Sequence, residues 1–163
     1  MWSRFDKDEE EQGASKLSRQ ALWFFIHAVL AVASWLALML AGYALNPPGV
    51  SQTFILIVSI FVPLAVGYIV TRIHPDEMAA SVWLLGLIWL LIISLWILDM
   101  PTGPNQCFQC DATEKLSRTF LSLPKPSGLI DDDGPFLGTW PAAALAGYSI
   151  GAWLARRGPK LRN

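Results

Sequence analysis

"MAASVWLLGLIWLLIISLWIL", residues 78–98, is a stretch of the sequence without a single charged side chain. Crossing the hydrocarbon core of a bilayer takes roughly 17–25 mostly apolar residues in a helix, so the stretch is long enough for one crossing. Leu, Ile and Trp would cover every face of this helix, which is typical of a membrane span or of the core of a large protein. A chain of 163 residues with several such stretches has no core that could bury them all. The stretch therefore predicts a transmembrane helix.

Similar apolar runs occur on both sides of this stretch. The chain is 53% hydrophobic and 15% charged, whereas an ordinary soluble domain has about 25% charged residues. The four predicted spans are residues 21–45, 53–70, 78–98 and 136–155. The first run is too long for the apolar part of a cleaved signal peptide, about 7–15 residues, so we expect it to remain in the protein. The sequence predicts an all-α integral membrane protein with four transmembrane helices.

The basic residues near the span ends predict the orientation of the chain. Each tail, the polar residues 1–20 and the basic residues 156–163, carries four Lys or Arg, and the loop between the second and third spans carries one. The loop of residues 99–135 carries three, and the first loop carries none. We therefore expect both termini in the cytoplasm and loop 99–135 on the opposite side. This threading fits a bacterial inner (plasma) membrane; in a eukaryotic cell it would place that loop in the ER lumen.

The only two cysteines, Cys107 and Cys110, lie in loop 99–135 with C-x-x-C spacing. Cysteines that face an oxidising compartment pair readily, so the spacing predicts a local disulfide. Three alternatives stay open: a redox pair that exchanges disulfides with a partner, free thiols, and a zinc site shared by two copies of the chain. A zinc site takes about four ligands, and the only histidines, His27 and His74, are expected across a membrane core of about 30 Å. We therefore predict no metal site within one chain.

Other signs of chemistry are weak. No predicted span holds Lys, Arg, Asp or Glu in its interior, which argues against an ion or proton pathway. We interpret His27 as an interfacial side chain bonded to water, lipid or a neighbouring helix. The sequence contains no phosphate-binding glycine loop and no nucleophile with a base in reach, and the net charge of −1 gives no nucleic-acid signal. We expect neither a cofactor nor a nucleic-acid partner.

Loop 99–135 contains one pattern of its own. Leu116, Phe120 and Leu123 recur at helical spacing, while Lys115 and Arg118 lie off this stripe. The pattern predicts a short amphipathic helix that lies on the outer surface of the membrane.

Small residues recur every four positions in two of the predicted spans, and such ladders let helix backbones approach closely in a membrane. The ladder residues are Ala143, Gly147, Gly151 and Ala155 in the fourth span and Ala33, Ala37 and Ala41 in the first. We expect the groove of the fourth span to receive the first span through its alanines. The alternative is that Gly and Ala are simply frequent in membrane helices.

Packing is thus the most informative feature of the sequence, and it favours a non-enzymatic function. We predict a small multi-pass accessory, assembly or scaffolding subunit whose partners are the lipid bilayer and the helices of other membrane proteins or of a second copy. Thiol–disulfide exchange through Cys107 and Cys110 is the alternative, and transport of a small apolar solute comes third.

Overall fold

The computed structural model describes residues 2–45, 52–100, 109–121 and 139–158, and all its regular elements in these ranges are helical. The elements in chain order are α1 (Trp2–Leu45), α2 (Gln52–Ile73), the 3-10 helix η1 (Met78–Ser81), α3 (Trp83–Asp99), α4 (Ala112–Leu121) and α5 (Thr139–Arg157). Three of them contain segments long and apolar enough to cross a membrane: Ser15–Leu38, Leu56–Ile73 and Met78–Asp99. The structure is therefore that of an all-helical protein with three helices fit for a bilayer.

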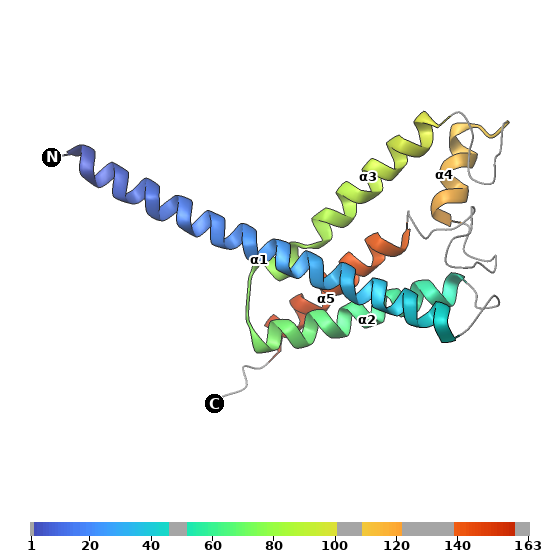
Figure 1. Cartoon of the computed structure of the whole chain (residues 1–163), viewed down its shortest axis with the longest axis horizontal. Coiled ribbons are helices and arrows are strands. Elements are labelled where there is room, and N and C mark those ends of the chain that lie inside the picture. The colour runs from blue at the N-terminus through green and yellow to red at the C-terminus, as the bar shows by residue number, and fades with distance from the viewer. Residues whose placement is uncertain (1, 46–51, 101–108, 122–138, 159–163) are drawn as a thin grey trace.

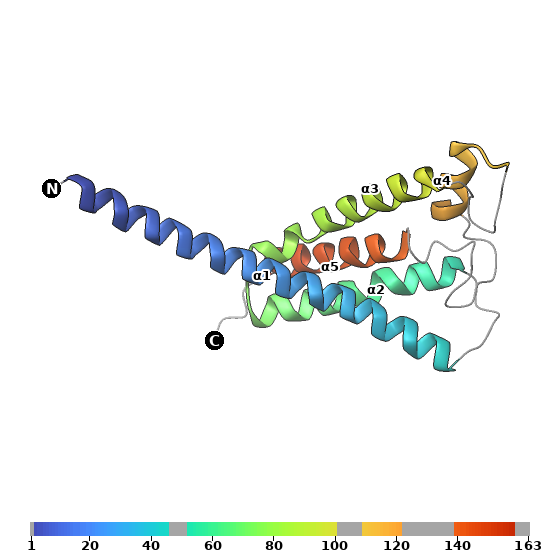
Figure 2. The ribbon, with the colours of Figure 1, turned by 45° about the horizontal axis from the view of Figure 1, so that its top comes forward.

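The predicted fourth span corresponds to α5, which is not one of these three helices. Its last turn carries Arg156 and Arg157, and small residues such as Ala and Gly fill much of its length. It is also the most enclosed helix, with buried residues on almost every side. Figure 2 shows α5 between α2 and α3. A helix covered by protein in this way needs little apolar surface of its own, because the neighbouring helices contact the lipid and this helix contacts mainly protein.

The helices run in alternating directions. Figure 1 shows α2 and α5 running side by side in the same direction, while α1 and α3 run the opposite way. Both chain ends consequently lie at the same end of the bundle, and α4 lies at the other end beside the last turn of α3.

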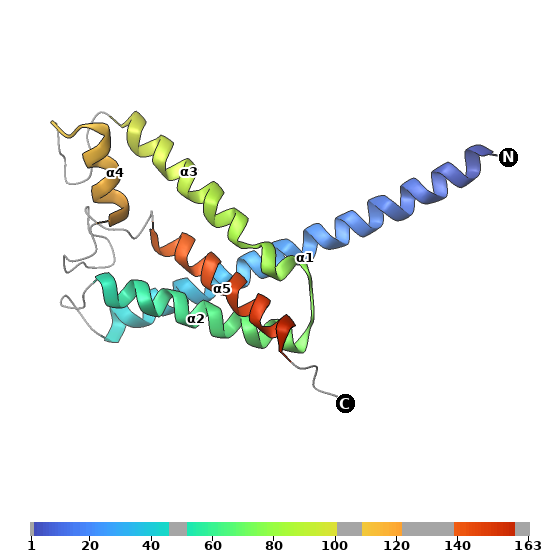
Figure 3. The same cartoon turned by 180° about the vertical axis from the view of Figure 1, so that it is seen from behind.

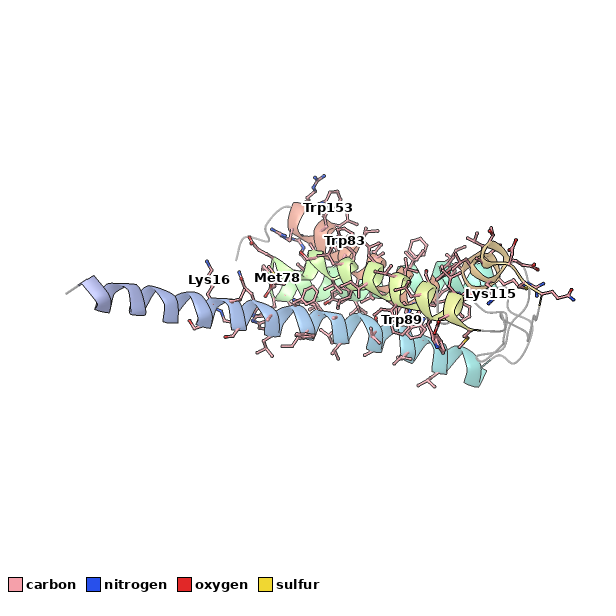
Figure 4. The ribbon with its side chains drawn as sticks, turned by 90° about the horizontal axis from the view of Figure 1, so that it is seen from above. Lys16, Met78, Trp83, Trp89, Lys115 and Trp153 are labelled. Carbon is pink, nitrogen blue, oxygen red and sulfur yellow. The ribbon has the colours of Figure 1, made fainter. Side chains whose placement is uncertain are left out.

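Helix α1 extends far beyond the other helices. Its 44 residues span about 66 Å at about 1.5 Å per residue, roughly twice the hydrocarbon thickness of a bilayer. The N-terminal part projects away from the bundle in Figures 1 and 3, and Lys16 lies on this projecting part in Figure 4. The polar residues 1–20, which the sequence analysis treats as a tail, thus continue the first span as one helix from Trp2 onward.

The segment between α2 and α3 makes a sharp, partly helical turn. Helix α2 ends at Ile73, and the next helical residues are those of η1. A side-chain oxygen of Asp76 accepts a hydrogen bond from the backbone N–H of Met78 at 2.7 Å, which satisfies one of the donors that the start of a helix leaves open. The turn brings Ala79 and Val82, both fully buried, into the apolar core with α1 and α5.

Candidate functional site

The closest helix contact in the structure joins α2 and α5, and glycine makes it possible. A side-chain carbon on Gly147 would collide with the backbone carbonyl of Ile60, and one on Gly151 would collide with that of Leu64. The contact is reciprocal, because a side-chain carbon on Gly67 of α2 would collide with the backbone carbonyl of Tyr148. Glycines from both helices thus remove the side chains that would otherwise hold the two backbones apart.

Helix α2 carries a small-residue ladder that is not among the predicted ones. Ser59, Pro63, Gly67 and Thr71 recur every four residues, and all four are buried. The signal is present in the sequence, but the ladder mixes Gly with Ser, Thr and Pro, whereas the ladders of the first and fourth spans are made of Gly and Ala. The hydroxyls of Ser59 and Thr71 are buried and have no hydrogen-bond partner among the described residues.

The predicted ladder of the fourth span lies on the face of α5 that the structure covers. Gly147, Gly151 and Ala155 are buried, and Ala143 is half-buried. The partner of the two glycines is α2, and not the first span as predicted. Ala33, Ala37 and Ala41 are exposed on α1 and do not enter this groove.

Helix α1 meets α5 through a buried polar pair instead. Nδ1 of His27 and the hydroxyl of Tyr148 share a hydrogen bond of 2.7 Å, and both side chains are fully buried. Among the described residues, the second ring nitrogen of His27, Nε2, has no partner. The sequence left water, lipid or a neighbouring helix as possible partners of His27. In the structure its partner belongs to a neighbouring helix.

The residue after Tyr148 ties α5 to α3. The backbone N–H of Trp83, the first residue of α3, donates a hydrogen bond of 2.8 Å to the hydroxyl of Ser149. A side chain from another helix thereby serves as the N-terminal cap that α3 lacks in its own sequence. Farther along α3, Gly86 packs against Ala142 and Leu145 of α5. Tyr148 and Ser149, which are consecutive in α5, therefore bind two different helices, α1 and α3.

Aromatic and charged side chains collect at the end of the bundle that carries the termini. The rings of Trp23 and His74 stack with their centres 4.3 Å apart, which joins α1 to the turn after α2. At the end of α5, the guanidinium of Arg157 lies 3.7 Å from the centre of the Trp153 ring. Figure 4 shows Trp153 near this end and Lys115 near the opposite one. Such contacts are typical of a membrane–water boundary, where amphipathic aromatic rings gather.

The predicted cysteine pair is only partly described. Cys110 is half-buried just before α4, whereas Cys107 lies outside the described residues. The disulfide between them stays a prediction. The helix expected in loop 99–135 is present as α4, with Leu116 and Phe120 half-buried; Leu123 lies outside the described residues.

The contacts in the described residues are contacts of helix packing. Within the described ranges, no three His, Cys, Asp or Glu side chains come together in a group that could hold a metal ion. The buried polar contacts join helices to one another. The candidate site is therefore the α5 interface: Gly67, Gly147 and Gly151 against α2, Tyr148 against His27, and Ser149 against α3.

Comparison with known proteins adds no relative from which a function could be carried over. No family model, no curated protein and no solved structure matches this chain. The class of the protein therefore follows from the structure itself: an all-helical chain with three helices fit for a membrane, organised around a buried central helix.

Proposed function

We propose that this chain is a small multi-pass membrane accessory, assembly or scaffolding subunit that acts by helix packing. The observation that carries the proposal is the exposure of α3. Of its seventeen residues, only Gly86, Ile93 and Ile97 are buried. Its outward faces carry bulky apolar side chains, namely Trp83, Leu84, Leu87, Ile88, Leu91, Ile92, Leu95, Trp96 and Leu98.

The way α3 is attached supports this role. It contacts α5 along a narrow edge and diverges from it toward the end that carries α4 (Figures 1 and 3). Bulky side chains on several faces can pack into the grooves of another helix, since association in lipid depends on van der Waals contact more than on hydrophobic drive. The helix of a partner protein or of a second copy would cover these faces. The enclosed α5 keeps the chain itself together.

The proposal includes the threading of the chain. In this threading the chain crosses a bacterial inner membrane four times, with both termini in the cytoplasm and loop 99–135 on the outer side, as the distribution of Lys and Arg favours. The alternating helix directions and the shared end of the two termini support this arrangement (Figure 1). The protein cover around α5 supports counting it as the fourth crossing, because a helix shielded by its neighbours tolerates lower hydropathy.

Affinity purification of the full chain in a mild detergent tests the proposal. We expect a membrane protein, or further copies of this chain, to copurify in fixed stoichiometry. Leu91→Ala combined with Leu95→Ala removes two exposed side chains of α3 and should weaken this association. The matched control is Leu36→Ala combined with Leu40→Ala, which removes two exposed side chains of α1. A chain that purifies alone as a monomer, or equal loss of the partner in both double variants, would contradict the proposal. Thiol–disulfide exchange and solute transport remain the alternatives from the sequence.

A further inference from the structure

A widely open cavity of about 350 Å³ lies at the surface between α3, α4 and α5, and it is lined by Leu90 and Ser94 of α3, Phe120 and Leu121 of α4, and Thr139 of α5. Its lining residues belong to α3, α4 and the first residue of α5, and Figures 1 and 3 show that α3 diverges from α5 at the end beside α4. Its volume is within the range of small-molecule sites in proteins, about 300–1,000 Å³.

The lining of the cavity favours an apolar occupant. The two hydroxyls in the lining are already satisfied: that of Ser94 donates to the carbonyl of Leu90 at 2.7 Å, and that of Thr139 donates to the carbonyl of Phe120 at 2.7 Å. Neither hydroxyl therefore has a proton left to offer a ligand. The other three lining side chains are hydrocarbon. A polar ligand would lose hydrogen bonds to water here, and the lining side chains would offer it only the two hydroxyl oxygens as acceptors in return.

The depth of the cavity matches one leaflet of a bilayer. Ser94 and Leu90 precede Met100 by six and ten residues along the chain, which is about 9 Å and 15 Å at about 1.5 Å per helical residue. Half of a hydrocarbon core is about 15 Å. If the end of α3 lies at the membrane surface, the cavity runs from just below that surface to near the middle of the membrane.

A cationic group lies at the surface end of this path. Nζ of Lys115 donates a hydrogen bond of 2.6 Å to the carbonyl of Met100. An ammonium group has three donors, and this bond to a neutral acceptor uses one. The neighbouring carboxylate of Glu114 pairs with Arg118 at 2.7 Å. Asp99 and Asp111 also lie at this end, but neither forms an ion pair with Lys115 among the described residues. A phosphate at the end of α3 would therefore meet an ammonium group that has donors to spare, and this group selects the occupant.

We propose that this cavity holds one acyl chain of a phospholipid from the leaflet on the α4 side, with the lipid phosphate bound by Lys115. The lipid fills the gap between α3 and α5 and braces α3 at its diverging end. The site does not depend on the accessory function proposed above, because a lipid can occupy it whether or not a protein partner covers the outer faces of α3.

Native mass spectrometry tests the proposal on the full chain, purified in mild detergent from nanodiscs that contain equal amounts of phosphatidylglycerol and phosphatidylcholine. We expect one retained phospholipid per chain, with the anionic lipid preferred. Ser94→Phe fills the cavity and should lower the retained fraction at least fivefold. Leu91→Phe adds the same side chain to an exposed position of α3 and should leave the retained fraction unchanged.

Lys115→Gln gives an independent readout that leaves the cavity lining intact. Removing one charge near the membrane surface should reduce the preference for phosphatidylglycerol over phosphatidylcholine about fivefold, while phosphatidylcholine binding stays the same. If Ser94→Phe does not fold, the Lys115→Gln result decides. The proposal is overturned if the wild-type chain retains no phospholipid, if Ser94→Phe retains as much as Leu91→Phe, or if Lys115→Gln keeps the lipid preference.

Discussion

Tyr148 joins two parts of the chain that are 121 residues apart, because its hydroxyl hydrogen-bonds the buried ring of His27. Both side chains are closed to solvent, so neither group can exchange this bond for one with water. Removing one partner leaves the other buried and unsatisfied. The pair therefore specifies how α1 sits against α5.

We predict that Tyr148→Phe lowers the free energy of unfolding by about 0.6 kcal/mol and by no more than about 1.7 kcal/mol, the average and the maximum measured for hydrogen bonds between membrane helices. Unfolding by SDS in mixed micelles, followed by tryptophan fluorescence, measures the change. A double-mutant cycle with His27→Leu should show that the two substitutions are coupled. Tyr68→Phe is the control, because Tyr68 is 38% exposed on α2. Equal stability of the two Phe variants would contradict the role of the bond.

The cysteines give a second prediction at the scale of residues. We expect Cys107 and Cys110 to be disulfide-bonded in the isolated protein, and thiol labelling before and after reduction measures this. Replacing both with Ser should lower the stability by about 2 kcal/mol or less, because so short a loop restrains the unfolded chain only weakly. Assembly should survive. Stoichiometric zinc in the purified protein, or full labelling without reduction, would show that the disulfide prediction is wrong.

Among the elements, α5 is central because each of its buried faces packs against a different helix. Glycines face α2, the tyrosine faces α1, and the serine caps α3. The apolar core follows the same arrangement, since Leu145, Tyr148 and Ala152 of α5 pack with Ala31 of α1 and Val82 before α3. A change on α5 should therefore disturb several helices, whereas a change on the outer face of α1 should disturb none.

At this scale we predict that Gly147→Ile and Gly151→Ile destabilise the protein by about 3 kcal/mol or more. Overpacking usually costs about 1–3 kcal/mol, and here the obstacle is the backbone of α2, which cannot rotate away as a side chain can. The same unfolding assay measures the effect. Ala33→Ile adds a side chain of the same kind at an exposed position of α1 and should change the stability little. Glycine variants that assemble and unfold like this control would contradict the close packing of α2 and α5.

For the whole molecule, the decisive question is how many times the chain crosses the membrane. We predict that a reporter active only in the cytoplasm works when fused after Asn163 and fails when fused near Ser127. The reason is the excess of Lys and Arg in the two tails and the second loop. The reciprocal reporter, active only outside the cytoplasm, is the control and should give the opposite pattern. Cytoplasmic activity at Ser127 would contradict the threading and remove the oxidising environment on which the predicted disulfide depends.

The amino-acid sequence by itself determined the helical fold class and three of the four predicted segments as fit for a membrane. A long uncharged run that crosses a membrane can adopt few structures, because its backbone groups must be hydrogen-bonded within the protein. Residues 78–98 predict the segment Met78–Asp99 closely, and the stripe of Leu116 and Phe120 predicts α4. The four-residue spacing also identified Gly147 and Gly151 as residues of a close helix contact.

Only the tertiary structure decided which helices meet. A ladder of small residues shows that another helix can come close, but it does not show which helix this is. The prediction named the alanines of the first span as the partner. The structure instead places α2 there, whose own ladder consists of Ser59, Pro63, Gly67 and Thr71. The bond between His27 and Tyr148 was equally out of reach, because it depends on the relative rotation of two helices that loops separate by more than a hundred residues. Local periodicity determines which face of a helix can pack. The choice of partner depends on how all the faces fit together at once.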